Sequence, residues 1–272
     1  MGKIRLTLTP WLNHGWQVPL YVTVCGLGTS PIPAGNEILE IEFDFISHRL
    51  VARTSRGQMR ELPLEPQTVA NFYQRVIELL NPIGVAVAIH EMPNEVPNAI
   101  RFSQDRTHAA YDPAAAHNFW RALVQADRVF KLFRTGFLGK ASPVHFFWGS
   151  FDLAVTRFSG RVAPPRPDAD PVTAEAYSHE VSSGGFWPGG GGVEGAAYYA
   201  YAAPEPPGFA EYKVQPEAAF YHPQLKEYLL MYDDVRRADS PKETLLQFLQ
   251  TTYDAAAILG KWDRRALERS VT

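Results

Sequence analysis

The residues best suited to chemistry lie in the segment 142–161, SPVHFFWGSFDLAVTRFSGR. This segment carries His145, Trp148, Asp152 and Arg157 among apolar and aromatic residues. Buried polar groups of this kind cost free energy unless they have partners. The sequence therefore predicts that other polar groups meet this segment, and it is the first place to expect a functional site.

Other chemically capable residues lie outside this segment, in YSHEV at 177–181, in GGFWPGGGG at 184–192, and beside turns near both ends of the chain. Clusters of aromatic and ionisable groups are typical of small-molecule pockets. We therefore expect a polar-aromatic pocket that binds or transforms a small molecule. Its predicted ligand-binding residues are His14, Trp16, His145, Trp148, Asp152, Arg157, His179, Glu180, Trp187 and His222.

The histidines also suggest a metal-dependent version of this site. Imidazole and carboxylate groups are suitable ligands for zinc or iron. If the protein is an enzyme, metal-assisted hydrolysis is therefore the first reaction to test. The residues that suggest it are His14, His145, His179, Glu180 and His222. The spacing is not diagnostic. His179-Glu180 begins like the H-E-x-x-H motif, but Ser183 occupies the second ligand position. The sequence therefore assigns no metal ligand, no cofactor and no catalytic residue.

Two further motifs contain residues that could take part in chemistry. Ser150 and Asp152 are neighbours on one face if 145–158 is a single strand, but the G-x-S-x-G elbow of serine hydrolases is absent. The glycine run 189–192 could bind an anion through backbone N–H groups or form a flexible lid. No G-K-[ST] follows it, so a P-loop is excluded.

Composition narrows the class of protein. The chain has 272 residues, 46% hydrophobic and 20% charged, with a net charge of -3 and one cysteine, Cys25. Lysine and arginine are scattered, which argues against nucleic-acid binding. No window approaches ~18 consecutive apolar residues, so we expect no membrane span and a cytoplasmic protein.

Hydrophobic periodicity predicts the elements that must position these residues. Alternating or β-branched runs predict strands at 4–8, 18–24, 38–46, 85–89, 144–158, 177–186, 196–202 and 227–231. Helical spacing predicts three main helices, at 69–80, from Pro113 to Gly136, and from a Ser240–Glu243 capping box to Gly260. This order predicts an α+β fold, with antiparallel sheets packed against three main helices. We expect a single domain over 1–272; a division into 1–111 and 112–272, and a duplicated two-layer arrangement, are both compatible with the pattern.

The segments SPVHFFWGSFDLAVTRFSGR, YSHEV and GGFWPGGGG, with VPLYVT at 18–23 and TSPIP at 29–33, resemble a bacterial domain-of-unknown-function family. The resemblance covers nearly the whole chain. It implies that a helix usually precedes the strand expected at 4–8, and it implies no activity.

The alternative to a pocket protein is a noncatalytic interaction protein or an oligomer-forming structural protein. In that case the same aromatic residues form a core or an interface, and the polar residues are buried pairs. The sequence leaves the oligomeric state open.

Overall fold

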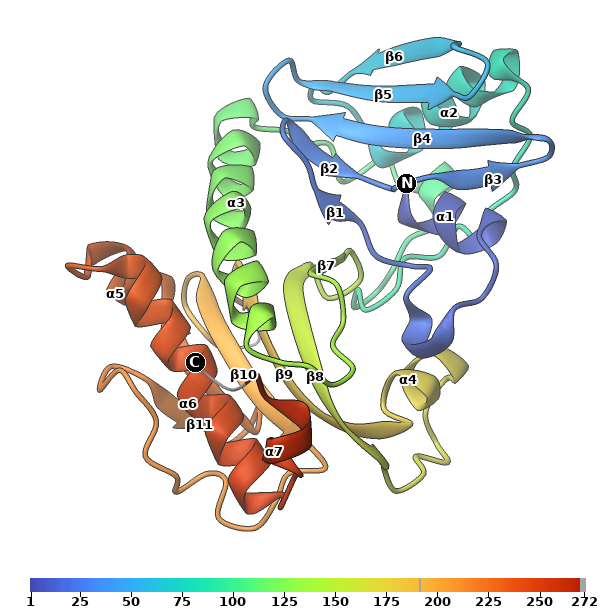
Figure 1. Ribbon diagram of the computed structural model, residues 1–272. Coiled ribbons are helices and arrows are strands. Elements are labelled where there is room, and N and C mark those ends of the chain that lie inside the picture. The colour runs from blue at the N-terminus through green and yellow to red at the C-terminus, as the bar shows by residue number, and fades with distance from the viewer. Residues whose placement is uncertain (191, 270–272) are drawn as a thin grey trace. The chain divides into compact units, whose positions relative to one another are not determined.

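The computed structural model describes residues 1–190 and 192–269 (Figure 1). The chain forms two compact units. Unit 1 comprises Met1–Leu12, Trp16–Val124 and Phe146–Ser150, and unit 2 comprises Asn13–Gly15, Gln125–His145 and Phe151–Thr272. In the described parts of the chain there are two antiparallel sheets of six strands each, together with helices, so the predicted α+β class is confirmed.

The sheet of unit 1 is built around one long strand. Its order is β1 (Tyr21–Val22), β2 (Gly26–Gly28), β4 (Glu37–Asp44), β5 (Arg49–Thr54) and β6 (Met59–Pro63), and β3 (Ile32–Ala34) pairs with β4. Strand β4 confirms the strand predicted at 38–46. Its alternation places Leu39 and Ile41 in the core, where both are fully buried.

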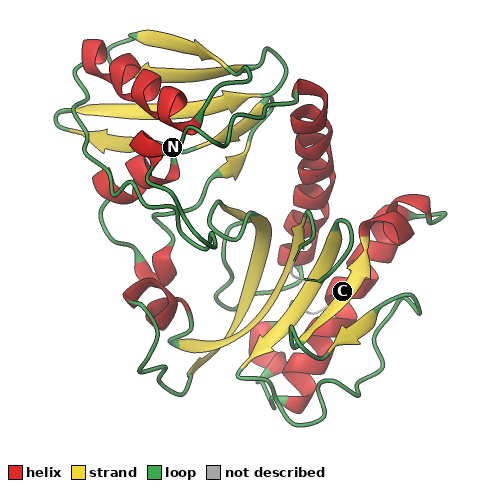
Figure 2. Ribbon diagram, turned by 180° about the vertical axis from the view of Figure 1, so that it is seen from behind, coloured by secondary structure: helices red, strands yellow, loops and turns green. Residues whose placement is uncertain are grey.

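Helix α2 (Val69–Leu80) covers one face of this sheet, as Figures 1 and 2 show from opposite sides. It begins after Thr68, whose hydroxyl accepts a hydrogen bond from the Asn71 N–H at 3.2 Å. Val76 and Leu80 join the core cluster of the sheet. The predicted helix at 69–80 is therefore confirmed. Short 3-10 turns follow it at η2 (Asn81–Ile83) and η3 (Phe102–Gln104).

Two strands predicted in unit 1 are wrong. Residues 4–8 belong to helix α1 (Gly2–Leu8), because Ile4 and Leu8 lie one helical turn apart and both pack against the core. Residues 85–89 form no strand; Val85 is buried in the same core without a neighbouring ladder.

The sheet of unit 2 has the order β11 (Phe220–His222), β12 (Glu227–Met231), β10 (Ala197–Ala203), β9 (His179–Trp187), β8 (Asp152–Val162) and β7 (His145–Phe147), the last strand lying where the two units meet in sequence. The strands predicted at 177–186, 196–202 and 227–231 are confirmed. The continuous strand predicted at 144–158 is wrong, because a turn at 148–151 separates β7 from β8. Phe151 in this turn has a φ of 60°.

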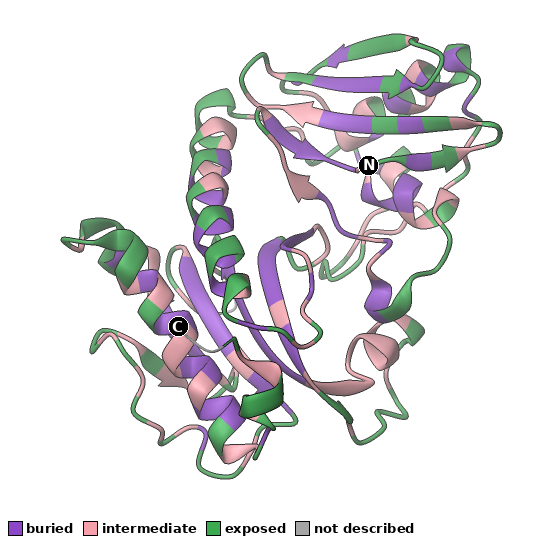
Figure 3. Cartoon of the chain, viewed as in Figure 1, coloured by how far each residue is buried: buried purple, intermediate pink, exposed green. Residues whose placement is uncertain are grey.

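The two long helices are confirmed as α3 (Pro113–Thr135) and α6 (Pro241–Leu259). Figures 1 and 2 show α6 against one face of the unit 2 sheet, and Figure 3 shows its buried stripe. The expected capping box is not formed: Ser240 makes no side-chain cap, and Glu243 pairs with Lys242. The shorter helices are η1 (Asn13–Gly15), α4 (Pro171–Ala176), α5 (Tyr232–Arg237) and α7 (Arg264–Leu267).

Candidate functional site

Strand alternation gives the unit 2 sheet two different faces. Val155 pairs with Gly184 and Thr156 with Ser183, so successive residues of β8 point to opposite sides. Leu153, Val155 and Arg157 share the face that packs against helices. Asp152 and Thr156 share the other face with Ser183, Tyr199 and Tyr201. We call this second side the polar face.

Arg157 is a core residue of the helix-covered face. It is 1% exposed, and its guanidinium donates a hydrogen bond to the carbonyl oxygen of Phe133. Its Cζ atom lies 3.4 Å from the centroid of the Phe133 ring and 4.3 Å from that of Tyr253. Burial lowers the pKa of Arg157 to about 10, which still leaves the side chain charged at neutral pH.

The polar face carries a connected set of hydroxyl groups and one carboxylate. The Tyr199 hydroxyl donates a hydrogen bond to the buried carboxylate of Asp152. The hydroxyls of Tyr201 and Tyr177 are 2.8 Å apart, and those of Thr156 and Ser183 are 2.9 Å apart. Burial, followed by the charge of Asp152, raises the pKa of Tyr199 well above its usual value, so its phenol stays protonated.

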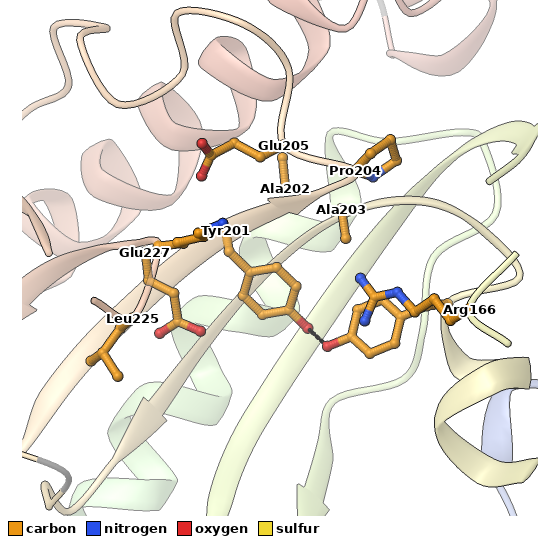
Figure 4. Close-up of a pocket in the computed structure, with 10 residues that line it drawn as sticks. Arg166, Tyr201, Ala202, Ala203, Pro204, Glu205, Leu225 and Glu227 are labelled. Carbon is orange, nitrogen blue, oxygen red and sulfur yellow. Dashed lines mark hydrogen bonds between the residues drawn. The ribbon is translucent and has the colours of Figure 1, made fainter. Parts of the chain in front are cut away.

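A cavity of about 330 Å³ opens at one end of the polar face (Figure 4). Small-molecule sites usually have volumes of about 300–1,000 Å³. Tyr201 projects from β10 and Glu227 begins β12, while Tyr177 follows α4. The polar side chains that line this cavity are Arg166, Tyr177, Tyr201, Glu205, Lys226 and Glu227.

Two of the residues that line the cavity, Glu227 and Arg166, are ionisable groups without a salt bridge among the described residues. Burial, and then the negative charge of Asp152, raise the pKa of Glu227 to about 7. The Cζ atom of Arg166 lies 3.9 Å from the centroid of the Tyr177 ring. Within residues 1–190 and 192–269, neither Arg166 nor Glu227 makes a salt bridge.

Sequence reasoning missed Arg166, Tyr201 and Glu227. Arg166 lies in a proline-rich loop, and Glu227 is one carboxylate at the start of a short strand, so neither carries a sequence signal. The alternation of tyrosine and alanine at 199–203 was a usable signal. It indicates aromatic side chains on one face of a strand with small residues between them.

Two predicted residues, Trp16 and Trp148, belong to unit 1. The Trp148 indole N–H donates to the Val18 carbonyl oxygen at 2.9 Å. The ring also lies so close to Gly2 that a Cβ atom there would be 2.1 Å from the indole nitrogen. Trp148 therefore helps to pack the first helix of unit 1.

His14 and His179 are brought together within unit 2, with ring centroids 5.7 Å apart. The His14 Nδ1–H donates to the Glu175 carbonyl oxygen at 3.1 Å, and Lys140 donates to His14 Nε2. Burial, and then the charge of Lys140, lower the pKa of His14, so its ring is neutral at pH 7. These two histidines form a cluster separate from the residues that line the cavity.

The remaining predicted residues of unit 2 lie in different surroundings. His145 is 1% exposed, and Glu180 pairs with Arg161 at 2.6 Å. Trp187 ends β9, half-buried. His222 on β11 lies opposite Glu227 on the neighbouring strand β12. The Nδ1 atom of His222 accepts a hydrogen bond from the Leu225 N–H at 3.3 Å.

The predicted residues of unit 2 therefore have different neighbours, and only some of them lie close together. Asp152 acts on the cavity through its charge, whereas Arg157 is enclosed beneath the helices. The ligand-binding roles of the predicted residues stay predictions.

No metal site is formed by the described residues: they contain no group of three or more His, Cys, Asp or Glu side chains that could hold a metal ion. The lid or anion cradle expected at 189–192 falls partly on Gly191, which lies outside the described residues. No helix in the described ranges is long and apolar enough to cross a membrane.

Fold and site together define an α+β protein whose second sheet carries a polar face and a small cavity. The chain belongs to a family of unknown function, DUF5996, whose model matches residues 1–269. No curated protein and no solved structure matches the chain. The family resemblance noted from the sequence is confirmed, and the function has to be argued from the site.

Proposed function

We propose that the protein binds a small polar molecule in the cavity of unit 2. The observation that carries this proposal is the hydrogen-bonded pair of Tyr201 and Tyr177 on the wall of a cavity of about 330 Å³, beside the carboxylate of Glu227. Pockets for small ligands combine aromatic surface with a few directed polar groups. This cavity has both.

The tyrosine pair leaves one hydrogen-bond donor for a ligand. Two phenol groups carry two hydrogens, and the contact between Tyr201 and Tyr177 uses one of them. Burial, followed by the proximity of Tyr177, raises the pKa of Tyr201 well above its usual value. Tyr201 therefore keeps its phenol hydrogen at neutral pH, and the hydrogen that the pair does not use can be accepted by Ser183, a ligand group or water.

A fragment screen tests this proposal. We would screen uncharged, anionic and cationic polar fragments by saturation-transfer NMR, against the wild type, Leu225→Trp and Leu132→Trp. Leu225 lines the cavity, whereas Leu132 is exposed on α3 and serves as the matched control. We expect fragments that bind the wild type and Leu132→Trp, and at least tenfold weaker binding to Leu225→Trp. Equal binding to all three proteins, or no binding to the wild type, would contradict the proposal.

Transformation of the bound molecule is the second candidate function, favoured by the position of Glu227 on the cavity wall. A carboxyl group with a pKa of about 7 suits general acid–base catalysis at neutral pH. Mass spectrometry of fragments incubated with the protein tests this version. Turnover that Glu227→Gln abolishes supports it, and fragments recovered unchanged count against it.

We further propose that the protein is cytoplasmic and binds neither nucleic acid nor membranes. A single half-buried cysteine and a net charge of -3 support this location and these exclusions. Cell fractionation tests the location.

The alternative, a noncatalytic interaction protein or oligomer, is tested by light scattering, because a monomer that binds fragments contradicts it.

A further inference from the structure

The cavity of unit 2 presents opposite charges on two of its walls. Arg166 comes from the loop before α4, and Glu227 comes from the first position of β12. In Figure 4 the guanidinium of Arg166 and the carboxylate of Glu227 lie on opposite sides of the Tyr201 ring. Among the described residues the two groups form no ion pair with each other.

We infer that the ligand is a small zwitterion, whose anionic group meets Arg166 and whose ammonium group meets Glu227. This inference rests on the proposed function, because it names the class of molecule that the same cavity binds. It follows from the charges on the two walls and from the side chains that hold them in place.

The anionic end is recognised by a guanidinium that lies over an aromatic ring. The Cζ atom of Arg166 lies 3.9 Å from the Tyr177 ring centroid, so the ring supports one face of the guanidinium. The N–H groups around the edge of the guanidinium stay directed away from the ring. A carboxylate accepts two such N–H groups in parallel, which makes it the expected partner.

The ammonium end is recognised by negative charge. The Glu227 carboxylate is close enough to Asp152 for the charge of Asp152 to raise the pKa of Glu227. A cation beside two such carboxylates relieves their repulsion and favours the ionised form of Glu227. The neighbouring Tyr201 ring adds a face that attracts an ammonium group.

The remaining charges on the cavity wall are also of both signs. Lys226 adds a second cation, and Glu205 adds a second carboxylate, which accepts a hydrogen bond from the Tyr221 hydroxyl at 2.6 Å. Two cations and two carboxylates therefore line the cavity. Groups of both signs therefore face a ligand, and a zwitterion offers an opposite charge to each sign.

Calorimetry with a graded series of probes tests the inference. The probes are glycine, β-alanine, 4-aminobutanoate and 6-aminohexanoate, which separate the same two charges by increasing distances. The N-acetyl derivative of the tightest binder retains only the anion, and its methyl amide retains only the cation. At pH 8 we expect the parent compound to bind at least tenfold more tightly than either derivative.

Variants assign each end of the ligand to its residue. Arg166→Gln weakens the parent compound and the N-acetyl derivative at least fivefold and leaves the methyl amide unchanged. Glu227→Gln weakens the parent compound and the methyl amide and leaves the N-acetyl derivative unchanged. The exposed residues Arg265 and Glu217 supply matched controls, Arg265→Gln and Glu217→Gln, which keep wild-type affinity.

The pH dependence gives an independent readout of the ammonium end. Ionisation of Glu227 strengthens binding of the parent compound and the methyl amide as the pH rises from about 6 to 8. The other charged or titratable groups around Glu227 are Asp152, Tyr177, Tyr199, Tyr201, Glu205, Lys226 and Arg166. Glu227→Gln flattens the profile if Glu227 is the group responsible.

Several results overturn the inference while leaving the proposed function intact. The inference fails if the derivatives bind as tightly as the parent compound, if Arg166→Gln and Glu227→Gln do not change affinity, or if the wild type has a flat pH profile. The proposed function still holds in these cases if Leu225→Trp removes the binding of polar fragments. Failure of every member of the probe series to bind also overturns the inference. The proposed function itself fails only if no polar fragment of any charge binds the wild type more tightly than it binds Leu225→Trp.

Discussion

Arg157 and Arg166 both stack on aromatic rings in unit 2, yet their surroundings differ. Arg157 is enclosed on the helix-covered face, with a hydrogen bond to the Phe133 carbonyl and three rings around it. Arg166 is exposed, rests on one ring and lines a cavity. The first arrangement stabilises a core, and the second leaves a charge on the wall of a cavity.

The same contrast separates the two faces of the sheet. On the helix-covered face a buried charge is held by groups of the protein. On the polar face Glu227 and Asp152 place negative charge beside an open cavity. The presence of a polar residue in a strand therefore says little about function. What distinguishes the two faces is whether the charge is enclosed by protein or directed at a cavity.

Removal of Arg157 gives the largest expected effect. Arg157→Ala leaves a large cavity among the rings of Phe133 and Tyr253, and we expect the free energy of unfolding to fall by about 3–5 kcal/mol. Arg166→Ala is the matched control and changes stability by less than about 0.5 kcal/mol. Urea denaturation measures both. Equal effects of the two substitutions would remove the distinction between the faces.

Glu227→Gln is expected to change the pH dependence of stability. The pKa of Glu227 is raised from 4.5 to about 7 in the folded protein, so the folded state binds more protons than the unfolded state between these values. The free energy of unfolding of the wild type therefore falls as the pH rises through this window.

The glutamine variant lacks this loss of stability. The free energy of unfolding of the variant, relative to that of the wild type, therefore increases between about pH 4.5 and about pH 7, by roughly 2–3 kcal/mol in total. Denaturation curves at several pH values measure it, with Glu217→Gln as the control. A constant difference between variant and wild type across the window would show that Glu227 does not titrate there.

Tyr199→Phe tests the hydrogen bond to Asp152 on the polar face. Loss of a hydrogen bond to a buried carboxylate lowers the free energy of unfolding by about 1.5 kcal/mol. Tyr212→Phe is the control, because its hydroxyl makes no hydrogen bond to the described residues. Identical unfolding midpoints for the two variants would contradict the role given to Tyr199.

Thr156→Val gives the smallest expected effect. It removes the hydroxyl that lies 2.9 Å from Ser183 while keeping the shape of the side chain. We expect a loss of about 1 kcal/mol in the free energy of unfolding. If ligand affinity is unchanged, Thr156 and Ser183 only stabilise the sheet. If affinity falls tenfold, the binding site includes this pair on the polar face.

Much of the fold was predictable because hydrophobic periodicity reports burial directly. Helices α2, α3 and α6 and strands β4, β10 and β12 follow from it. The errors arise where tertiary contacts decide the structure. Alternation at 4–8 also fits one face of the short helix α1. The break after β7 includes a positive φ at Phe151, which is uncommon for a phenylalanine, and the turn residues Gly149 and Ser150 were its only sequence signal.

The candidate site was less predictable, because the order of the strands in the sheet decides which of its residues lie near one another. Asp152 was identified from its apolar surroundings, and its effect on Glu227 depends on strand order, with β9 and β10 between them. Arg157 had the same sequence signature as Asp152, but alternation placed it on the opposite face. A single sequence shows which residues are unusual without showing which face has a cavity.

A crystal structure of the protein soaked with the tightest-binding probe tests the central claim most directly. The account predicts ligand density within contact distance of Tyr201, Tyr177 and Glu227. Density at a different place on the molecule, with the cavity beside Tyr201 filled only by water, would contradict it.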